Sequence, residues 1–154
     1  MSEDRVDDAG AKVRECDVTV LVVDDQAPFR EAARAVVDRL SGFEVVADAE
    51  SGEAAIAIVE SLRPQLVLMD IKMGGIDGTG GMDGIEATAE IIARYPDTMV
   101  VLVSTYELND LPPTARTSGA RAYINKDDFG GRLLRRLWES SGDPGFWLAE
   151  QTSD

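Results

Sequence analysis

Five short apolar segments, separated by stretches with helical patterning, constrain the fold of this chain most strongly. They comprise residues 18–23, 45–47, 66–69, 99–103 and 122–124. Within them apolar and β-branched residues follow one another instead of alternating with polar ones, as is typical of strands that are buried on both faces. The pattern therefore predicts a parallel sheet with helices covering both of its sides.

The stretches between these segments carry helix signals. Apolar residues recur every three or four positions across residues 29–40, which gives a helix with one apolar face. Ser51 is a predicted N-cap of a second helix, and Asp83 with Glu86 forms a predicted capping pair for a third. Strand and helix then alternate five times, which predicts an α/β, doubly wound, five-stranded parallel sheet. The remaining expected helices are a short one over 111–118 and a last one that begins near Asp127 or Asp128.

Charge and composition exclude several classes of function. The chain has 15 Lys and Arg against 29 Asp and Glu, for a net charge of −14, which would repel a nucleic-acid backbone. It has no histidine, which excludes a Ser-His-Asp triad and histidine-ligated zinc. No apolar run approaches the roughly 20 residues that cross a membrane. The first residues lack the features of a signal peptide, so we expect a cytoplasmic protein without nucleic-acid or membrane partners.

The domain organisation expected from the sequence is simple. Residues 1–17 are acidic without an apolar pattern and are predicted to form a flexible N-terminal arm. Residues 18–140 are predicted to form one domain, since about 150 residues support a single core. Residues 141–154 form a C-terminal tail, in which Phe146, Trp147 and Leu148 are expected to pack back on the domain or to contact a partner.

Polar residues that can carry chemistry follow the predicted strands. Asp24 and Asp25 end the first strand, Asp70 the third and Ser104 the fourth, while Lys126 follows the fifth. The carboxyl ends of parallel strands form one crevice, so these groups should converge there. Three neighbouring carboxylates repel one another and suit Mg²⁺. Asp70, in the central position, is the expected phosphoryl acceptor, with the lysine and the serine contacting the phosphoryl oxygens.

Four segments resemble, in their order, the signatures of receiver domains of two-component response regulators: VLVVDDQAPFR, LVLMDIKM, VVLVSTYE and GARAYINKD. The resemblance covers residues 18–140 and implies a flavodoxin-like receiver fold with strand order 2-1-3-4-5. It also implies that Mg²⁺ or Mn²⁺ is bound by the carboxylates of Asp24, Asp25 and Asp70 and by the backbone carbonyl of Lys72.

The same resemblance implies a role for each remaining site residue. Asp70 would be the phosphoacceptor, and Ser104 and Lys126 would bind the phosphoryl group. Tyr123 would be a switch whose ring turns inward when Ser104 is drawn to the phosphoryl group. Lys72 and Tyr106 would modulate the lifetime of the aspartyl phosphate by covering the approach of water.

The chain departs from the family pattern at two places. Asp127 follows Lys126, at a position where the family often has proline. In this respect the chain resembles the receivers of LuxR-type regulators, in which aspartate follows the lysine. After Asp70, a glycine-rich unit occurs twice, as GGIDG and GGMDG, so the loop before the third helix is lengthened. We expect this loop to be a flexible insertion, because its glycines favour no single backbone conformation.

These observations predict a stand-alone response regulator receiver, a phosphoprotein in a phosphorelay and not a classical enzyme. It would accept a phosphoryl group on Asp70 from a histidine kinase or phosphotransfer protein in trans, and signal by contact with an output protein or by homodimerisation. The alternative is a small Mg²⁺-dependent phosphatase or nucleotide-binding α/β domain. A haloacid-dehalogenase-type phosphatase would require a second Asp two residues after Asp70, where the chain has Lys72. A third possibility is a receiver fold that acts as an unphosphorylated scaffold.

Overall fold

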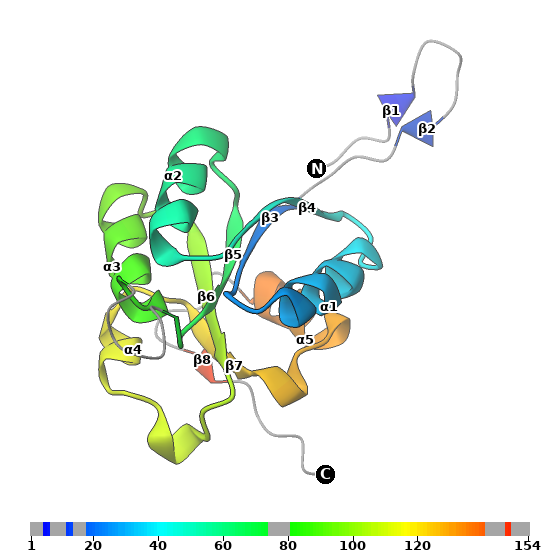
Figure 1. Cartoon of the computed structure of the whole chain (residues 1–154). Helices are drawn as coiled ribbons and strands as arrows, with labels where there is room; N and C mark the ends of the chain where they lie inside the picture. Colours follow the sequence, from blue (N-terminus) through cyan, green and yellow to red (C-terminus); the bar gives the residue numbers. More distant parts are fainter. Residues whose placement is uncertain (1–4, 7–11, 14–17, 74–80, 141–146, 149–154) are drawn as a thin grey trace.

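The computed structural model describes residues 5–6, 12–13, 18–73, 81–140 and 147–148 (Figure 1). Its main sheet is parallel throughout, with strand order β4-β3-β5-β6-β7-β8. The first five of these reproduce the predicted order 2-1-3-4-5 and confirm the predicted fold class. The strands are β3 (Val18–Val23), β4 (Phe43–Ala49), β5 (Leu66–Asp70), β6 (Met99–Ser104), β7 (Ala122–Asn125) and β8 (Trp147–Leu148).

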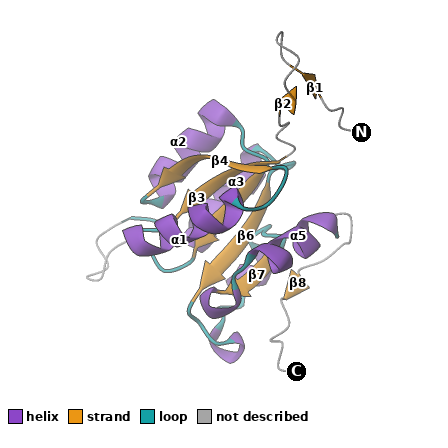
Figure 2. Cartoon of the chain, turned by 90° about the vertical axis from the view of Figure 1, so that its right-hand side faces the viewer, coloured by secondary structure: helices purple, strands orange, loops and turns teal. Residues whose placement is uncertain are grey.

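Helices cover both faces of the sheet, as Figure 2 shows. On one face, α1 (Ala27–Asp38) and α5 (Gly131–Glu139) pack on alternate residues of the strands, including Val20, Leu68 and Val103. On the other face lie α2 (Gly52–Leu62), α3 (Gly84–Arg94) and the short α4 (Thr114–Thr117), over residues such as Leu21, Met69 and Leu102. The inner strands are buried on both sides, which explains their uninterrupted apolar runs.

The predicted helix caps of α2 and α3 are present. The Ser51 hydroxyl oxygen accepts a hydrogen bond of 3.1 Å from the backbone N–H of Ala54. Asp83 and Glu86 form a reciprocal capping box, in which each side chain accepts from the other's backbone N–H, at 2.8 and 3.0 Å. Both caps satisfy N–H groups that have no partner inside the helix, so each fixes where its helix begins.

The last two helices differ from the prediction. α4 is only four residues long, because Pro112 and Pro113 precede it and Gly119, with φ +100°, ends the turn after it. α5 begins at Gly131 and not at Asp127 or Asp128. Those two aspartates lie in a separate 3₁₀ turn, η2 (Lys126–Asp128), in which the Asp127 N–H donates to the side chain of the preceding Asn125.

The segments outside the predicted domain contribute short strands. β1 (Arg5–Val6) and β2 (Lys12–Val13) pair antiparallel with each other in the N-terminal arm, a ladder that we did not predict. β8 pairs parallel with β7, which confirms that Trp147 and Leu148 return to the domain and adds an unpredicted sixth strand. Residues 74–80 of the repeated glycine loop, and Phe146, lie outside the described residues. In the part of the chain that the structure describes, no helix is long and apolar enough to cross a membrane.

Candidate functional site

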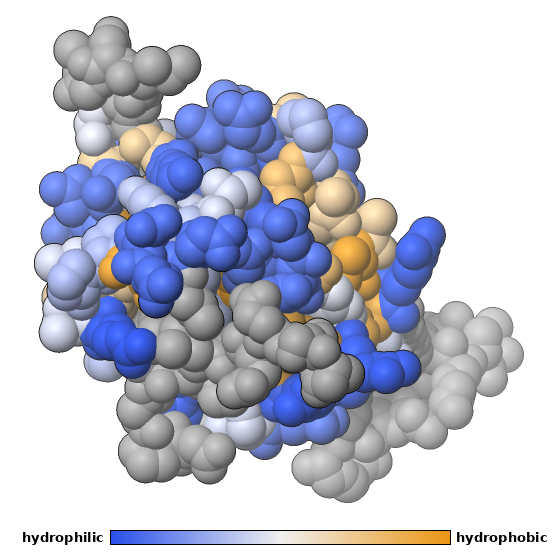
Figure 3. Space-filling model, turned by 90° about the horizontal axis from the view of Figure 1, so that it is seen from below, coloured by the Kyte–Doolittle hydropathy of each residue, from blue (hydrophilic) through white to orange (hydrophobic). Residues whose placement is uncertain are grey.

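The carboxyl edge of the sheet contains an open pocket of about 710 Å³. Six of its lining residues come from the predicted site: Asp25, Asp70, Lys72, Ser104, Tyr106 and Lys126. This edge lies at the lower side of the molecule in Figure 1, and in the view from below in Figure 3 hydrophilic residues make up most of the coloured surface. The structure thus brings together side chains that are as far apart in sequence as Asp25 and Lys126.

Three carboxylates form the acidic part of the site. Asp24 and Asp25 follow β3, and Asp70 is the last residue of β5 in the neighbouring position of the sheet. One oxygen from each lies within 4.8 Å of the others. Asp25 is exposed, whereas Asp24 and Asp70 are buried. Oxygen donors at this spacing, open to solvent on one side, fit a divalent cation that keeps part of its water shell.

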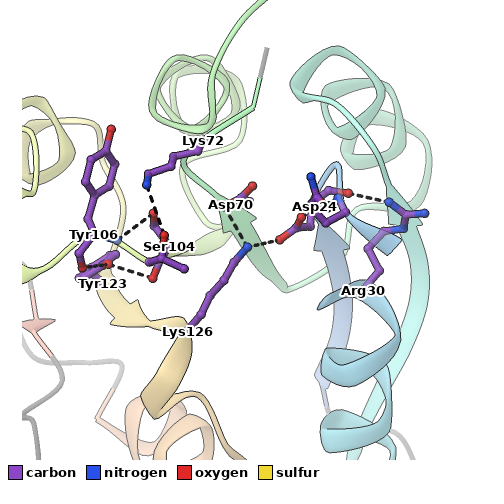
Figure 4. A network of polar contacts seen from close by, with 10 residues as sticks. Asp24, Arg30, Asp70, Lys72, Ser104, Tyr106, Tyr123 and Lys126 are labelled. Atoms are coloured by element: carbon purple, nitrogen blue, oxygen red, sulfur yellow. Dashed lines mark hydrogen bonds and ion pairs between the residues drawn. The ribbon is translucent and has the colours of Figure 1, made fainter. Parts of the chain in front are cut away.

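The buried Asp24 is held from several directions (Figure 4). Its Oδ1 accepts from the backbone N–H of Gln26 at 2.7 Å, and its carbonyl accepts from Nη1 of Arg30 at 2.8 Å. Its Oδ2 accepts from Nζ of Lys126 at 2.6 Å. The backbone before α1 and Lys126 after β7 therefore fix this carboxylate.

Lys126 connects the two buried carboxylates. Its Nζ lies 2.6 Å from Oδ2 of Asp24 and 3.4 Å from Oδ1 of Asp70, and 4.6 Å from the centre of the Phe29 ring. Burial disfavours the ammonium charge, but the hydrogen bond to Asp24 and the charges of both aspartates outweigh it and raise the pKa of Lys126. The lysine is therefore a fixed positive charge at the edge of the pocket.

Asp70 is the group whose ionisation is most perturbed. Burial first, and the negative charge of Asp24 second, raise the pKa of Asp70 to about 7, although Lys126 acts in the opposite direction. The side chain is only 3% exposed, so its charge is poorly hydrated. A cation bound at the cluster would favour the ionised carboxylate and so lower this pKa.

The other wall of the pocket is the loop after β6. The buried Ser104 has its Oγ bonded to the backbone N–H of Tyr106, at 3.3 Å. Nζ of Lys72 donates to Oγ1 of Thr105 at 3.3 Å and lies 4.4 Å from the centre of the Tyr106 ring. The two predicted lifetime modulators, Lys72 and Tyr106, therefore contact each other across the pocket (Figure 4).

The ring of Tyr123 is already inside the protein. It is 1% exposed, and burial raises the pKa of its hydroxyl to about 12. That hydroxyl donates to the carbonyl of Tyr106 at 2.7 Å and is also 3.1 Å from the carbonyl of Ser104. The structure thus places the ring inside the protein, and its role as a phosphorylation switch stays a prediction.

One contributor was not anticipated from the sequence. Asn125, buried at the end of β7, donates from Nδ2 to the carbonyl of Tyr106 at 3.0 Å. Its position held a usable signal, since it lies two residues after Tyr123 on the same face of the strand and directly before Lys126. The proposed role of the Lys72 carbonyl as a metal ligand stays a prediction.

Comparison with known proteins gives consistent results. Residues 20–137 match the family described as the response regulator receiver domain. The chain is 34% identical over 126 residues to the transcriptional regulatory protein DegU of Brevibacillus brevis, covering 82% of this chain and 51% of that protein. It is 37% identical over 109 residues to the response regulator GacA of Pseudomonas protegens, covering 71% and 48%.

A solved structure shows the same similarity. It is that of a DNA-binding response regulator of the LuxR family from Staphylococcus aureus, with a TM-score of 0.68 and 25% sequence identity, covering 82% of this chain and 99% of that one. This similarity confirms the predicted likeness to receivers of LuxR-type regulators. The chain spans about half the length of the two curated relatives that it matches.

Proposed function

Because the chain belongs to the response regulator receiver domain family of two-component systems, we propose that Asp70 accepts a phosphoryl group from a phosphohistidine donor. The donor would be a histidine kinase or a phosphotransfer protein, and the reaction would require Mg²⁺ or Mn²⁺. The observation that carries this proposal is the juxtaposition of Asp70 with two further carboxylates and with Lys126 at the edge of one pocket.

The charge of the cluster fits a divalent cation. Three carboxylates and one ammonium leave two negative charges when all are ionised, which a doubly charged cation would neutralise. Asp24, Asp25 and Asp70 are the side chains that would hold it. When bound, the cation would offset the negative charge of the phosphoryl oxygens next to the carboxylates. Without it, an incoming phosphoryl group would meet a repulsive site.

Side chains of the protein would accept the phosphoryl group and bind its oxygens. A carboxylate oxygen of Asp70 forms the new bond to phosphorus while the bond from phosphorus to the donor's imidazole nitrogen breaks, and that nitrogen keeps the electron pair. Lys126, already 3.4 Å from Asp70, is placed to bind a phosphoryl oxygen. The hydroxyl of Ser104, at the end of the adjacent strand, can donate to another.

The signal would be passed on by protein contacts, either with an output protein or with a second copy of the chain. The net charge of −14 supports a protein partner in preference to direct contact with nucleic acid.

Intact-mass measurement after incubation with acetyl phosphate tests the proposal. We expect one phosphoryl group per chain with Mg²⁺, none with EDTA, and none in Asp70→Asn. Asp83→Asn is the matched control, because it also removes one pocket carboxylate but keeps a side chain that caps α3 well; it should be phosphorylated. Equal phosphorylation of Asp70→Asn, or phosphorylation without metal, would contradict the proposal. Turnover of a small phosphoester without any adduct would support the phosphatase alternative.

A further inference from the structure

The carbonyl of Tyr106 accepts two side-chain hydrogen bonds from β7. The hydroxyl of Tyr123 donates at 2.7 Å and Nδ2 of Asn125 at 3.0 Å. A carbonyl oxygen has two lone pairs, so both acceptor positions are used. The loop after β6 is therefore fastened to the next strand at one peptide group, by two residues on the same face of that strand.

The orientation of Asn125 is determined by its surroundings. Its Oδ1 accepts from the backbone N–H of Asp127 at 2.8 Å, in the 3₁₀ turn that begins with Lys126. If the amide were reversed, its oxygen would face the Tyr106 carbonyl and its NH₂ would face an N–H group. Asn125 thus connects the turn that carries Lys126 to the loop that carries Tyr106.

The fastened peptide group belongs to a residue that lines the pocket. The Tyr106 ring lies under Nζ of Lys72, whose ammonium is also bonded to Thr105. Tyr106 and Lys72 both line the pocket that contains Asp70. Movement of the Tyr106 backbone would displace the ring and remove the partner of Lys72.

We propose that Asn125 is a positioning residue. It holds the Tyr106 carbonyl against β7, and so keeps the Tyr106 ring and Lys72 together in the lining of the pocket. Because the Tyr106 carbonyl accepts from Asn125 as well as from Tyr123, its position does not depend on Tyr123 alone. The consequence for aspartyl phosphate rests on the proposed function: with Asn125 in place, water reaches the phosphorus slowly.

Hydrogen exchange in the unphosphorylated chain separates this role from simple capping of the turn. Asn125→Ser keeps an acceptor for the Asp127 N–H but is too short to reach the Tyr106 carbonyl. Asn125→Leu has neither function. We expect peptides covering residues 104–111, which include the bonded N–H groups of Tyr106 and Asp110, to exchange about fivefold faster in both variants, as for loss of one ordinary hydrogen bond. Faster exchange at Asp127 is expected only in Asn125→Leu.

Residues 66–70 of β5 provide the internal reference, because their exchange should match the parent in every variant that is folded. Exchange over 104–111 that is unchanged in Asn125→Ser and faster only in Asn125→Leu would reduce Asn125 to a cap and overturn the proposal. The exchange experiment gives this answer whether or not the chain can be phosphorylated. Failure of the proposed function would instead be seen in the intact-mass experiment. Where aspartyl phosphate forms, its decay should be about fivefold faster in Asn125→Ser; an unchanged decay would overturn the shielding role.

Discussion

The interior of the sheet and Asp70 at its carboxyl edge are almost equally buried but differ in chemistry. In β5, Leu68 and Met69 are fully buried among apolar side chains, and the next residue, Asp70, is 3% exposed and carries a carboxyl group. Burial stabilises the leucine and methionine, at about 25 cal/mol per Å² of apolar surface. It destabilises the carboxylate, as the pKa of about 7 shows. The apolar interior thus stabilises the fold, while the buried carboxylate of Asp70 lowers its stability and is the proposed phosphoacceptor.

The largest expected effect comes from disrupting the interior. Leu68→Ala should lower the free energy of unfolding by about 2–5 kcal/mol, because a fully buried side chain would leave a cavity between the sheet and helices α1 and α5. Chemical denaturation measures the loss. Leu62→Ala is the control, since that leucine is 51% exposed and should change stability by less than about 0.5 kcal/mol. Equal losses in the two variants would contradict the assigned core.

Removing the buried charge of Asp70 should raise the free energy of unfolding, whereas Leu68→Ala should lower it. Without divalent cations, Asp70→Asn should raise the free energy of unfolding by about 1–3 kcal/mol near pH 8, because an ionised buried carboxylate is replaced by a neutral amide.

The sign of this effect follows from the raised pKa. The folded state holds the Asp70 proton up to about pH 7, whereas the ordinary pKa of an aspartate is 3.8, so the parent loses stability as pH rises between these values. The advantage of Asp70→Asn should therefore be full above the higher value and disappear below the lower one. Chemical denaturation of the parent and of Asp70→Asn at several pH values from below 3.8 to above 7 measures this difference. If Asp70→Asn is less stable than the parent at pH 8, the raised pKa is contradicted.

A smaller effect on the free energy of unfolding is expected at the N-cap of α2. Ser51→Ala should cost about 1 kcal/mol, because the N–H of Ala54 loses its partner at the start of α2. Ser51→Asn should retain most of the stability, since asparagine caps as well as serine does. If the asparagine variant loses as much as the alanine variant, the cap does not set the stability of this helix end.

The smallest change concerns the lifetime of the aspartyl phosphate. Lys72→Gln or Tyr106→Ala should shorten it by about two- to fivefold, the size expected for loss of one exposed cation–π contact. The two residues contact each other, so the double variant should decay faster than either single one but by less than the product of their effects. Decay of the phosphorylated mass after donor removal is the measurement. Single variants that decay like the parent would show that shielding does not set the rate.

The predictable features were those determined by local pattern or by parallel topology. Ser51 and Asp83 cap their helices through contacts only three residues away. Asp24, Asp25 and Asp70 converge because parallel strands bring their carboxyl ends to one edge, so the cluster follows once the strands are known.

The features that sequence reasoning missed depend on contacts between distant residues. β8 is a two-residue strand that exists through its pairing with Ala122 and Tyr123, and two residues make no recognisable apolar run. The contact of Asn125 with the Tyr106 carbonyl spans 19 positions and leaves no periodic signal. The late start of α5 follows from the turn at Lys126–Asp128, which the Asn125 side chain caps.

The most direct test of the acidic cluster as a divalent-cation site is thermal unfolding with and without Mg²⁺, in the parent, in Asp70→Asn and in Asp83→Asn. A cation that binds only the folded state raises the unfolding temperature by mass action. The carboxylate geometry predicts a clear rise in the parent and in Asp83→Asn, and little or none in Asp70→Asn. A rise of equal size in Asp70→Asn, or none in the parent at millimolar Mg²⁺, would contradict the assignment of this cluster as the cation site.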